Sequence, residues 1–223
     1  MKRSVPFLTA LLILAANGCV LPTFEHAVST PESSFWDDKL CGEWVPITIG
    51  TNGTIKKDNQ PVLIGHDPKN KGWTIIGSMR INAEHEIEHE IRHFLATRIG
   101  DDQFISIPMS EDENFFATPT TGKSDLPNNV KKYALGKYSY DVKTDRLGVR
   151  WVSPIKLKEA MQRGMLLGTI TEETTERNGK KELKLKAIHV ESTTKQLREF
   201  LKQYPDMIFE DTTEYLQRVA PKG

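Results

Sequence analysis

Histidine and glutamate alternate with isoleucine between residues 85 and 93, where the sequence reads HEIEHEIRH. Its first five residues match the pattern of zinc peptidases, in which two histidines one helical turn apart bind zinc beside a glutamate that acts as general base. On a helix, His85 and His89 would be the metal ligands and Glu86 the base. A zinc-dependent hydrolase is therefore one hypothesis for this chain.

The same segment also fits a β-strand, because isoleucine and histidine fall on one side and glutamate on the other over residues 86–91. It runs into β-branched residues and then the turn Gly100-Asp101-Asp102, which favours the strand. Histidines four residues apart on a strand lie about 13 Å apart, too far to share one ion. We therefore predict no catalytic residue, no cofactor and no metal site, and His85 and His89 remain metal candidates only under the hydrolase hypothesis.

Short alternating segments closed by turn residues make up most of the remaining chain, and they predict a mainly β, antiparallel fold with two short helices. Ser153-Pro154 predicts the start of one helix, and a residue within 192–194 the start of the other. The expected strands are 44–49, 61–64, 73–81, 87–99, 104–108, 133–142, 147–153, 166–175, 183–190 and 214–219, and the helices are about 153–164 and 192–205.

The N-terminus carries a charged start, the apolar run VPFLTALLILAA and then Ala16-Asn17-Gly18-Cys19. This end resembles the lipobox of bacterial lipoproteins, and the resemblance implies cleavage before Cys19 and lipid on its sulfur. Residues 1–18 are then a signal peptide, 19–38 the lipidated cysteine with a flexible tether, and 39–219 a single β-rich domain. The protein is expected to be exported and held to a membrane of the cell envelope, on its periplasmic or outer-surface side.

Charge and cysteine content exclude two classes of protein. Lysine plus arginine equals aspartate plus glutamate at 30 each, and removal of Lys2 and Arg3 leaves 28 against 30. Such a nearly neutral domain lacks the basic surface of a nucleic-acid-binding protein. Lipidation of Cys19 would leave Cys41 as a lone thiol, which excludes a disulfide scaffold. We assign Cys41 a structural role.

Gly42-Glu43-Trp44 opens the first expected strand of the domain, and Arg218 lies near the last. This pair resembles the Gly-x-Trp motif and the late arginine of lipocalins and related calycin barrels. The resemblance implies a closed barrel in which the arginine covers the tryptophan at the floor. The helix after Ser153 interrupts the strands where a simple lipocalin would continue.

The stretch from Leu40 to Val219 is also similar to a group of uncharacterised bacterial lipoproteins, which supports fold and location but implies no activity. We expect a non-catalytic domain that binds a small apolar ligand or a protein partner in the envelope. Besides the zinc hydrolase, the alternative is a structural lipoprotein whose barrel is filled by its own side chains. An apolar cavity would favour the ligand, and bulky inward residues the structural role.

Overall fold

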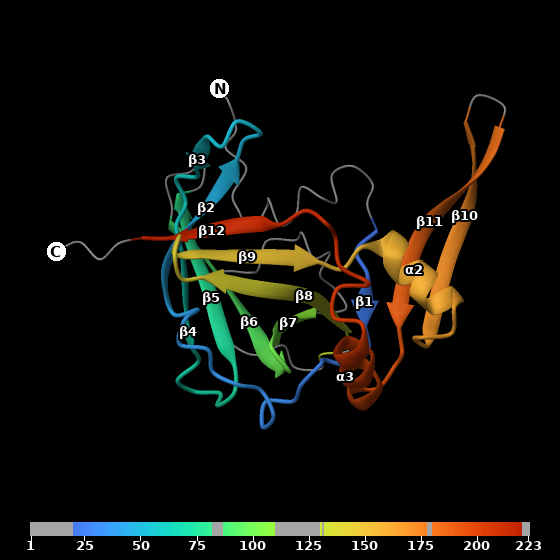
Figure 1. The fold of residues 1–223 in the computed structure, drawn as a ribbon, viewed down its shortest axis with the longest axis horizontal. Helices are drawn as coiled ribbons and strands as arrows, with labels where there is room; N and C mark the ends of the chain where they lie inside the picture. Colours follow the sequence, from blue (N-terminus) through green and yellow to red (C-terminus); the bar gives the residue numbers. More distant parts are fainter. Residues whose placement is uncertain (1–19, 82–86, 110–129, 131, 178–179, 220–223) are drawn as a thin grey trace.

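The computed structural model describes residues 20–81, 87–109, 130, 132–177 and 180–219. Among these, eight antiparallel strands close into a barrel (Figure 1). They follow one another around the barrel in chain order, as β2 (Gly42–Ile49), β4 (Val62–His66), β5 (Thr74–Ile81), β6 (Ile87–Ile99), β7 (Asp102–Met109), β8 (Lys132–Asp141), β9 (Arg146–Trp151) and β12 (Glu214–Arg218). The mainly β class and the calycin-like barrel predicted from the sequence are confirmed.

The barrel closes because β12 pairs with both β9 and β2, which places Arg218 opposite Trp44. Alternation along each strand separates the inner wall from the outer wall. In β4, for example, Val62 and Ile64 are buried and Leu63 between them is exposed. Closure into a ring gives each of the eight strands a partner strand on both sides, although β6 pairs with β7 only over Leu95–Ile99.

An insertion between β9 and β12 forms the second part of the molecule. It consists of α2 (Pro154–Gln162), β10 (Gly168–Arg177), β11 (Lys180–Val190) and α3 (Thr194–Gln203). Proline at the first turn starts α2, and a capping box between Thr193 and Gln196 starts α3. The β10–β11 hairpin joins the barrel through β1 (Thr23–Phe24), which pairs with β11 on one side and β8 on the other (Figure 1).

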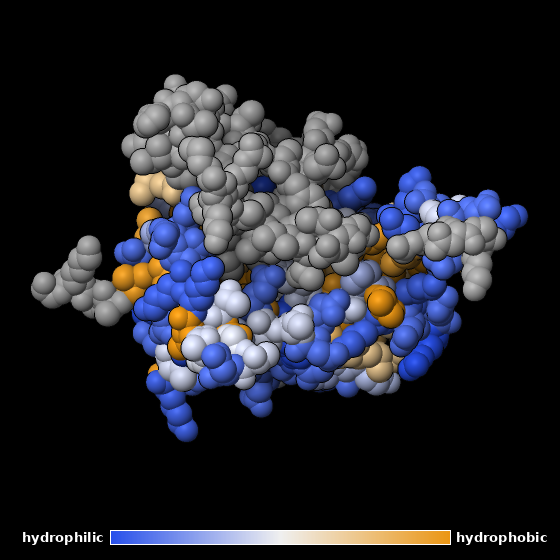
Figure 2. All heavy atoms as spheres, turned by 90° about the horizontal axis from the view of Figure 1, so that it is seen from above, coloured by the Kyte–Doolittle hydropathy of each residue, from blue (hydrophilic) through white to orange (hydrophobic). Residues whose placement is uncertain are grey.

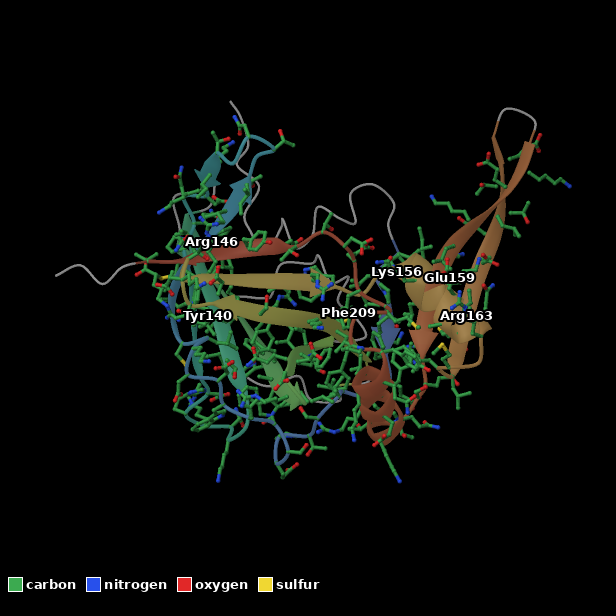
Figure 3. All side chains as sticks on the ribbon, in the orientation of Figure 1. Tyr140, Arg146, Lys156, Glu159, Arg163 and Phe209 are labelled. Carbon is green, nitrogen blue, oxygen red and sulfur yellow. The ribbon has the colours of Figure 1, made fainter. Side chains whose placement is uncertain are left out.

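Two apolar cores result from this arrangement. One fills the barrel and contains Leu40, Trp44, Val62, Ile64, Phe94, Ala96, Ile105, Ile107, Met109, Ala134, Tyr138, Leu147, Val149, Trp151 and Leu216. The other lies between the outer wall of the barrel and the insertion, and it includes Phe24, Val28, Phe104, Leu157, Ile188, Leu197, Phe200 and Phe209. Figure 3 shows Tyr140 and Arg146 at one end of the barrel, and Phe209 towards α2.

The stretch predicted to be a flexible tether, 19–38, differs from that expectation. From residue 20 onward it follows the barrel, forms β1 and buries Phe24 and Val28, each 1% exposed, in the second core. A strand of two residues leaves no alternating pattern in the sequence. The short β3 (Ile55–Lys57), which pairs with β2, was likewise not predicted. No helix within the described ranges is long and apolar enough to cross a membrane.

Candidate functional site

One end of the barrel is sealed by an arginine stacked on a tryptophan. The Trp44 side chain is fully buried, and its Nε1 donates a hydrogen bond of 2.7 Å to the carbonyl oxygen of Leu40. The guanidinium carbon of Arg218 lies 4.2 Å from the centre of the Trp44 ring system. Tyr140 meets Trp44 edge to face, with ring centres 6.2 Å apart. These residues form what we call the sealed end.

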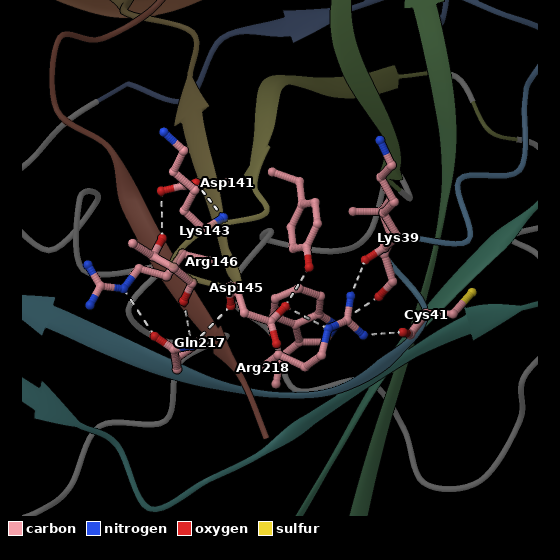
Figure 4. A network of polar contacts seen from close by, with 12 residues as sticks. Lys39, Cys41, Asp141, Lys143, Asp145, Arg146, Gln217 and Arg218 are labelled. Carbon is pink, nitrogen blue, oxygen red and sulfur yellow. Dashed lines mark hydrogen bonds and ion pairs between the residues drawn. The ribbon is translucent and has the colours of Figure 1, made fainter. Parts of the chain in front are cut away.

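Arg218 also satisfies backbone groups of the turn that leads into β2 (Figure 4). Its Nη1 donates to the carbonyl oxygen of Cys41 at 2.6 Å, and its Nη2 donates to that of Lys39. Its Nε donates to Asp145 Oδ1 at 2.9 Å. Hydrogen bonds from Tyr140 and then Arg218 hold the pKa of Asp145 below its usual range. One side chain therefore ties the last strand to the chain entering the first.

Gly42 has a structural reason to be glycine. Its φ is +140°, and a Cβ at this position would lie 2.5 Å from Nη1 of Arg218. A side chain here would push the guanidinium away from Trp44. The glycine of the Gly-x-Trp motif thus makes room for the arginine.

The segment before β2 plugs the barrel beneath this stack. Phe35 packs against the barrel core, and Asp37 is 5% exposed. Asp37 Oδ2 accepts hydrogen bonds from the Tyr138 hydroxyl at 3.0 Å and from Gln103 Nε2 at 3.2 Å. Burial and then the Asp37 charge raise the pKa of Tyr138 far above its ordinary value, so this phenol remains a hydrogen-bond donor.

The other end of the barrel, which we call the second end, has a different lining. Trp151 belongs to the barrel core together with Ile107 and Met109, and its Nε1 donates to Glu214 Oε2 at 3.1 Å. Burial raises the pKa of Glu214. Glu214 therefore brings a carboxyl group next to apolar side chains at this end of the barrel.

Hollows also lie outside the barrel. A groove of about 380 Å³ on β4, β5 and β6 is lined by Leu63, Met79 and Ile91, which are 54%, 57% and 40% exposed. A larger hollow of about 690 Å³ lies beside β1 and is lined partly by Glu25, His26, Lys132, Tyr133, His189 and Glu191. On the face shown in Figure 2, the described hydrophobic residues are scattered among hydrophilic ones.

The zinc-peptidase hypothesis required a helix over residues 83–98, and this requirement is not met. Residues 87–99 form strand β6, as the favoured interpretation predicted, and His89 pairs with Met79 of β5. His85 and Glu86 lie outside the described residues. So does Cys19, the predicted site of lipid attachment. A strand does not bring two histidines four positions apart onto one ion.

One group of metal-binding residue types does converge in the described part of the chain, and the sequence did not predict it. Asp38, Cys41 and His66 place one donor atom each within 4.8 Å of one another. His66 Nε2 lies 2.9 Å from Asp38 Oδ1 and 3.5 Å from Cys41 Sγ, and its ring stacks on Trp36 with centres 4.3 Å apart. His66 follows Cys41 by 25 residues, and neither position is part of a recognisable spacing.

Comparison of the chain with models of protein families, with curated proteins and with solved structures finds no match. The class of the protein therefore follows from its topology: an eight-stranded antiparallel barrel of calycin-like form with an inserted hairpin and two helices.

Proposed function

We propose that this chain is a lipid-anchored envelope protein whose barrel binds a small, mainly apolar ligand at its second end and catalyses no reaction. The observation that supports ligand binding is the position of Glu214 at the second end, where its carboxyl group lies beside Trp151, a residue of the apolar barrel core that also contains Ile107 and Met109. A barrel that served only as a structural body would gain stability from an apolar residue at that position.

The two ends of the barrel differ in what fills them. At the sealed end, Trp44, Leu40 and Phe35 fill the interior, and Arg218 closes it. At the second end, a carboxyl group with a raised pKa lies beside an indole ring. Burial of a carboxylate away from water is unfavourable unless a hydrogen-bond donor or a positively charged group lies next to it. The complementary ligand is an apolar body that carries a hydrogen-bond donor or an amine.

A titration with the fluorescent apolar amine N-phenylnaphthylamine tests this proposal. The chain from Val20 onward is used, because it contains every contact described above. We expect saturable binding that is weakened at least tenfold by Trp151→Ala and by Glu214→Gln. Leu63→Ala, on the outer groove, is the control and should bind like the unmodified chain. Absence of binding by all chains would favour the purely structural role, and loss of binding only in Leu63→Ala would move the site to the outer groove.

The anchor part of the proposal rests on the lipobox-like end of the sequence. β1 begins at Thr23, four residues after Cys19, and four extended residues span about 13 Å. An acylated Cys19 would therefore hold β1, and with it the junction between the hairpin and the barrel, close to the membrane. A hollow beside Val20 and Leu21 is lined by Lys132, Lys184 and Lys186 and by one acid, Glu173, which lies 3.8 Å from Lys186. The excess of lysine suits anionic headgroups.

Mass spectrometry of the N-terminal peptide from the membrane fraction tests the anchor. We expect an acylated Cys19 as the first residue, and we expect Cys19→Ala to abolish both processing and acylation. An unmodified Cys19 in a chain cleaved elsewhere would refute the anchor and leave the binding proposal intact.

A further inference from the structure

We propose that Asp38, Cys41 and His66 form a binding site for a divalent transition metal, with Zn²⁺ as the ion that fits best. The site would lie next to the sealed end, and it is independent of the ligand proposed for the second end. Each residue contributes a different donor: a carboxylate oxygen, a thiolate sulfur and an imidazole nitrogen. This mixture suits zinc, which accepts all three.

The observed distances match the spacing of donors around one zinc ion. With Zn–S of about 2.3 Å and Zn–N of about 2.0 Å, tetrahedral geometry puts sulfur and nitrogen about 3.5 Å apart. Cys41 Sγ and His66 Nε2 are 3.5 Å apart. Nitrogen and oxygen ligands lie about 3.3 Å apart in the same geometry, and the 2.9 Å between His66 Nε2 and Asp38 Oδ1 is slightly shorter. The Asp38 side chain is 95% exposed, so it can move outward by the difference.

Three elements of the fold hold these donors in place. Asp38 and Cys41 belong to one turn, in which the Cys41 amide donates to the Asp38 carbonyl oxygen at 3.1 Å. His66 ends β4, which pairs with β2 so that Gly42 lies opposite Ile64, and this register carries the end of β4 alongside the turn. The Trp36 ring stacks at 15° on the imidazole and fixes its plane. The fold therefore positions Cys41 and His66 before any ion arrives, and the exposed Asp38 side chain can adjust to the ion.

Charges of both signs surround the Cys41 sulfur. Asp38 and Asp37 supply two carboxylates, and Arg218 supplies a guanidinium, which donates to the Cys41 carbonyl oxygen at 2.6 Å. The two carboxylates would offset the charge of a bound cation. His66 Nδ1 is buried and has no hydrogen-bond partner in the described part of the chain. Because an acceptor at this atom strengthens metal sites, we expect an affinity roughly 10- to 100-fold below that of a site with such a partner.

Metal titration of the full chain, purified in detergent, reduced and stripped with a chelator, tests the site. Zn²⁺ is titrated against a chromophoric chelator, and Co²⁺ is used in parallel to detect thiolate-to-metal charge transfer. We expect one Zn²⁺ per chain, a charge-transfer band with Co²⁺ and a change in Trp36 fluorescence. Cys41→Ala should abolish the band, and His66→Ala and Asp38→Asn should each weaken binding at least tenfold.

His189→Ala is the matched control, because His189 is also half-buried and hydrogen-bonded, to Thr23 Oγ1 at 2.9 Å, but lies on β11. It should bind Zn²⁺ like the unmodified chain, and circular dichroism checks that each variant is folded. Asp38→Asn alters only an exposed side chain, so it tests the site even if another variant unfolds. Less than one Zn²⁺ per chain, or unchanged binding in Cys41→Ala, would overturn the proposal. Loss of Zn²⁺ only in a His85→Ala, His89→Ala double variant would place the ion on that segment instead.

Discussion

Removal of the Arg218 side chain should destabilise the whole barrel, because this residue joins the last strand to the segment that enters the first. Arg218→Ala leaves two carbonyl oxygens, those of Lys39 and Cys41, without their charged donor. Each such bond contributes roughly 1 kcal/mol or more. The stacking on Trp44, at 4.2 Å, contributes about another 1 kcal/mol.

The ion pair with Asp145 contributes less, because the Asp145 side chain is 43% exposed and water screens the pair. We therefore expect Arg218→Ala to lower the free energy of unfolding by about 3 kcal/mol. Arg218→Lys keeps a positive charge but loses the planar fork, so it should recover less than half of this loss. Arg146→Ala is the matched control, since Arg146 lies in the neighbouring strand and its Nε donates to the neutral Gln217 Oε1 at 3.0 Å. It should lower stability by less than about 1 kcal/mol.

Urea unfolding of the chain from Val20 onward, followed by tryptophan fluorescence, measures these differences. The slope of the free energy of unfolding against urea concentration should be the same in all variants, so a shift in the urea midpoint measures a change in stability. A loss in Arg218→Ala no larger than that in Arg146→Ala would show that the sealed end does not hold the barrel together. The assignment of Gly42, Trp44 and Arg218 as one structural unit would then be wrong.

Three further predictions concern groups held in unusual surroundings. Gly42→Ala should lower the free energy of unfolding by at least about 2 kcal/mol, because the φ of Gly42 is +140° and the new methyl group would clash with Arg218. Equal urea midpoints for this variant and the unmodified chain would contradict the prediction. Glu214→Gln should raise the melting temperature at pH 7 by a few degrees and have little effect near pH 4. The raised pKa of Glu214 means that stability is highest while the carboxyl is protonated and falls as pH rises through that pKa, so a gain independent of pH would refute the assignment. Burial raises the pKa of Asp67, but hydrogen bonds from Asn70, Lys69 and His93 outweigh it and lower the pKa overall. Asp67→Asn should therefore lower stability at neutral pH by about 2 kcal/mol, a difference that calorimetry should find to shrink as pH falls below the ordinary carboxyl pKa.

Strand β6 shows how far local patterns reach. The predicted bounds, 87–99, agree with the structure, because alternation and the following Gly-Asp-Asp turn are local signals. The sequence did not predict which side of this strand faces the barrel interior. The side that carries His93 and Leu95 is the outer one, yet both are buried, His93 against Asp67 and Trp73. When both faces of a strand are covered, alternation does not identify the inner one.

The strands of the barrel and hairpin, the two helices and the antiparallel order were predicted from the sequence alone, since these depend on periodicity, capping and turn residues over short distances. The calycin-like class was implied by the resemblance that Gly42, Trp44 and Arg218 carry. The sequence did not reveal that residues 20–38 pack on the domain, because β1 gains its burial from partners far along the chain. Nor did it bring His66 to Asp38 and Cys41, or Glu214 to Trp151. Those contacts arise only when the ring of strands closes and its register aligns residues that carry no mutual pattern in the sequence.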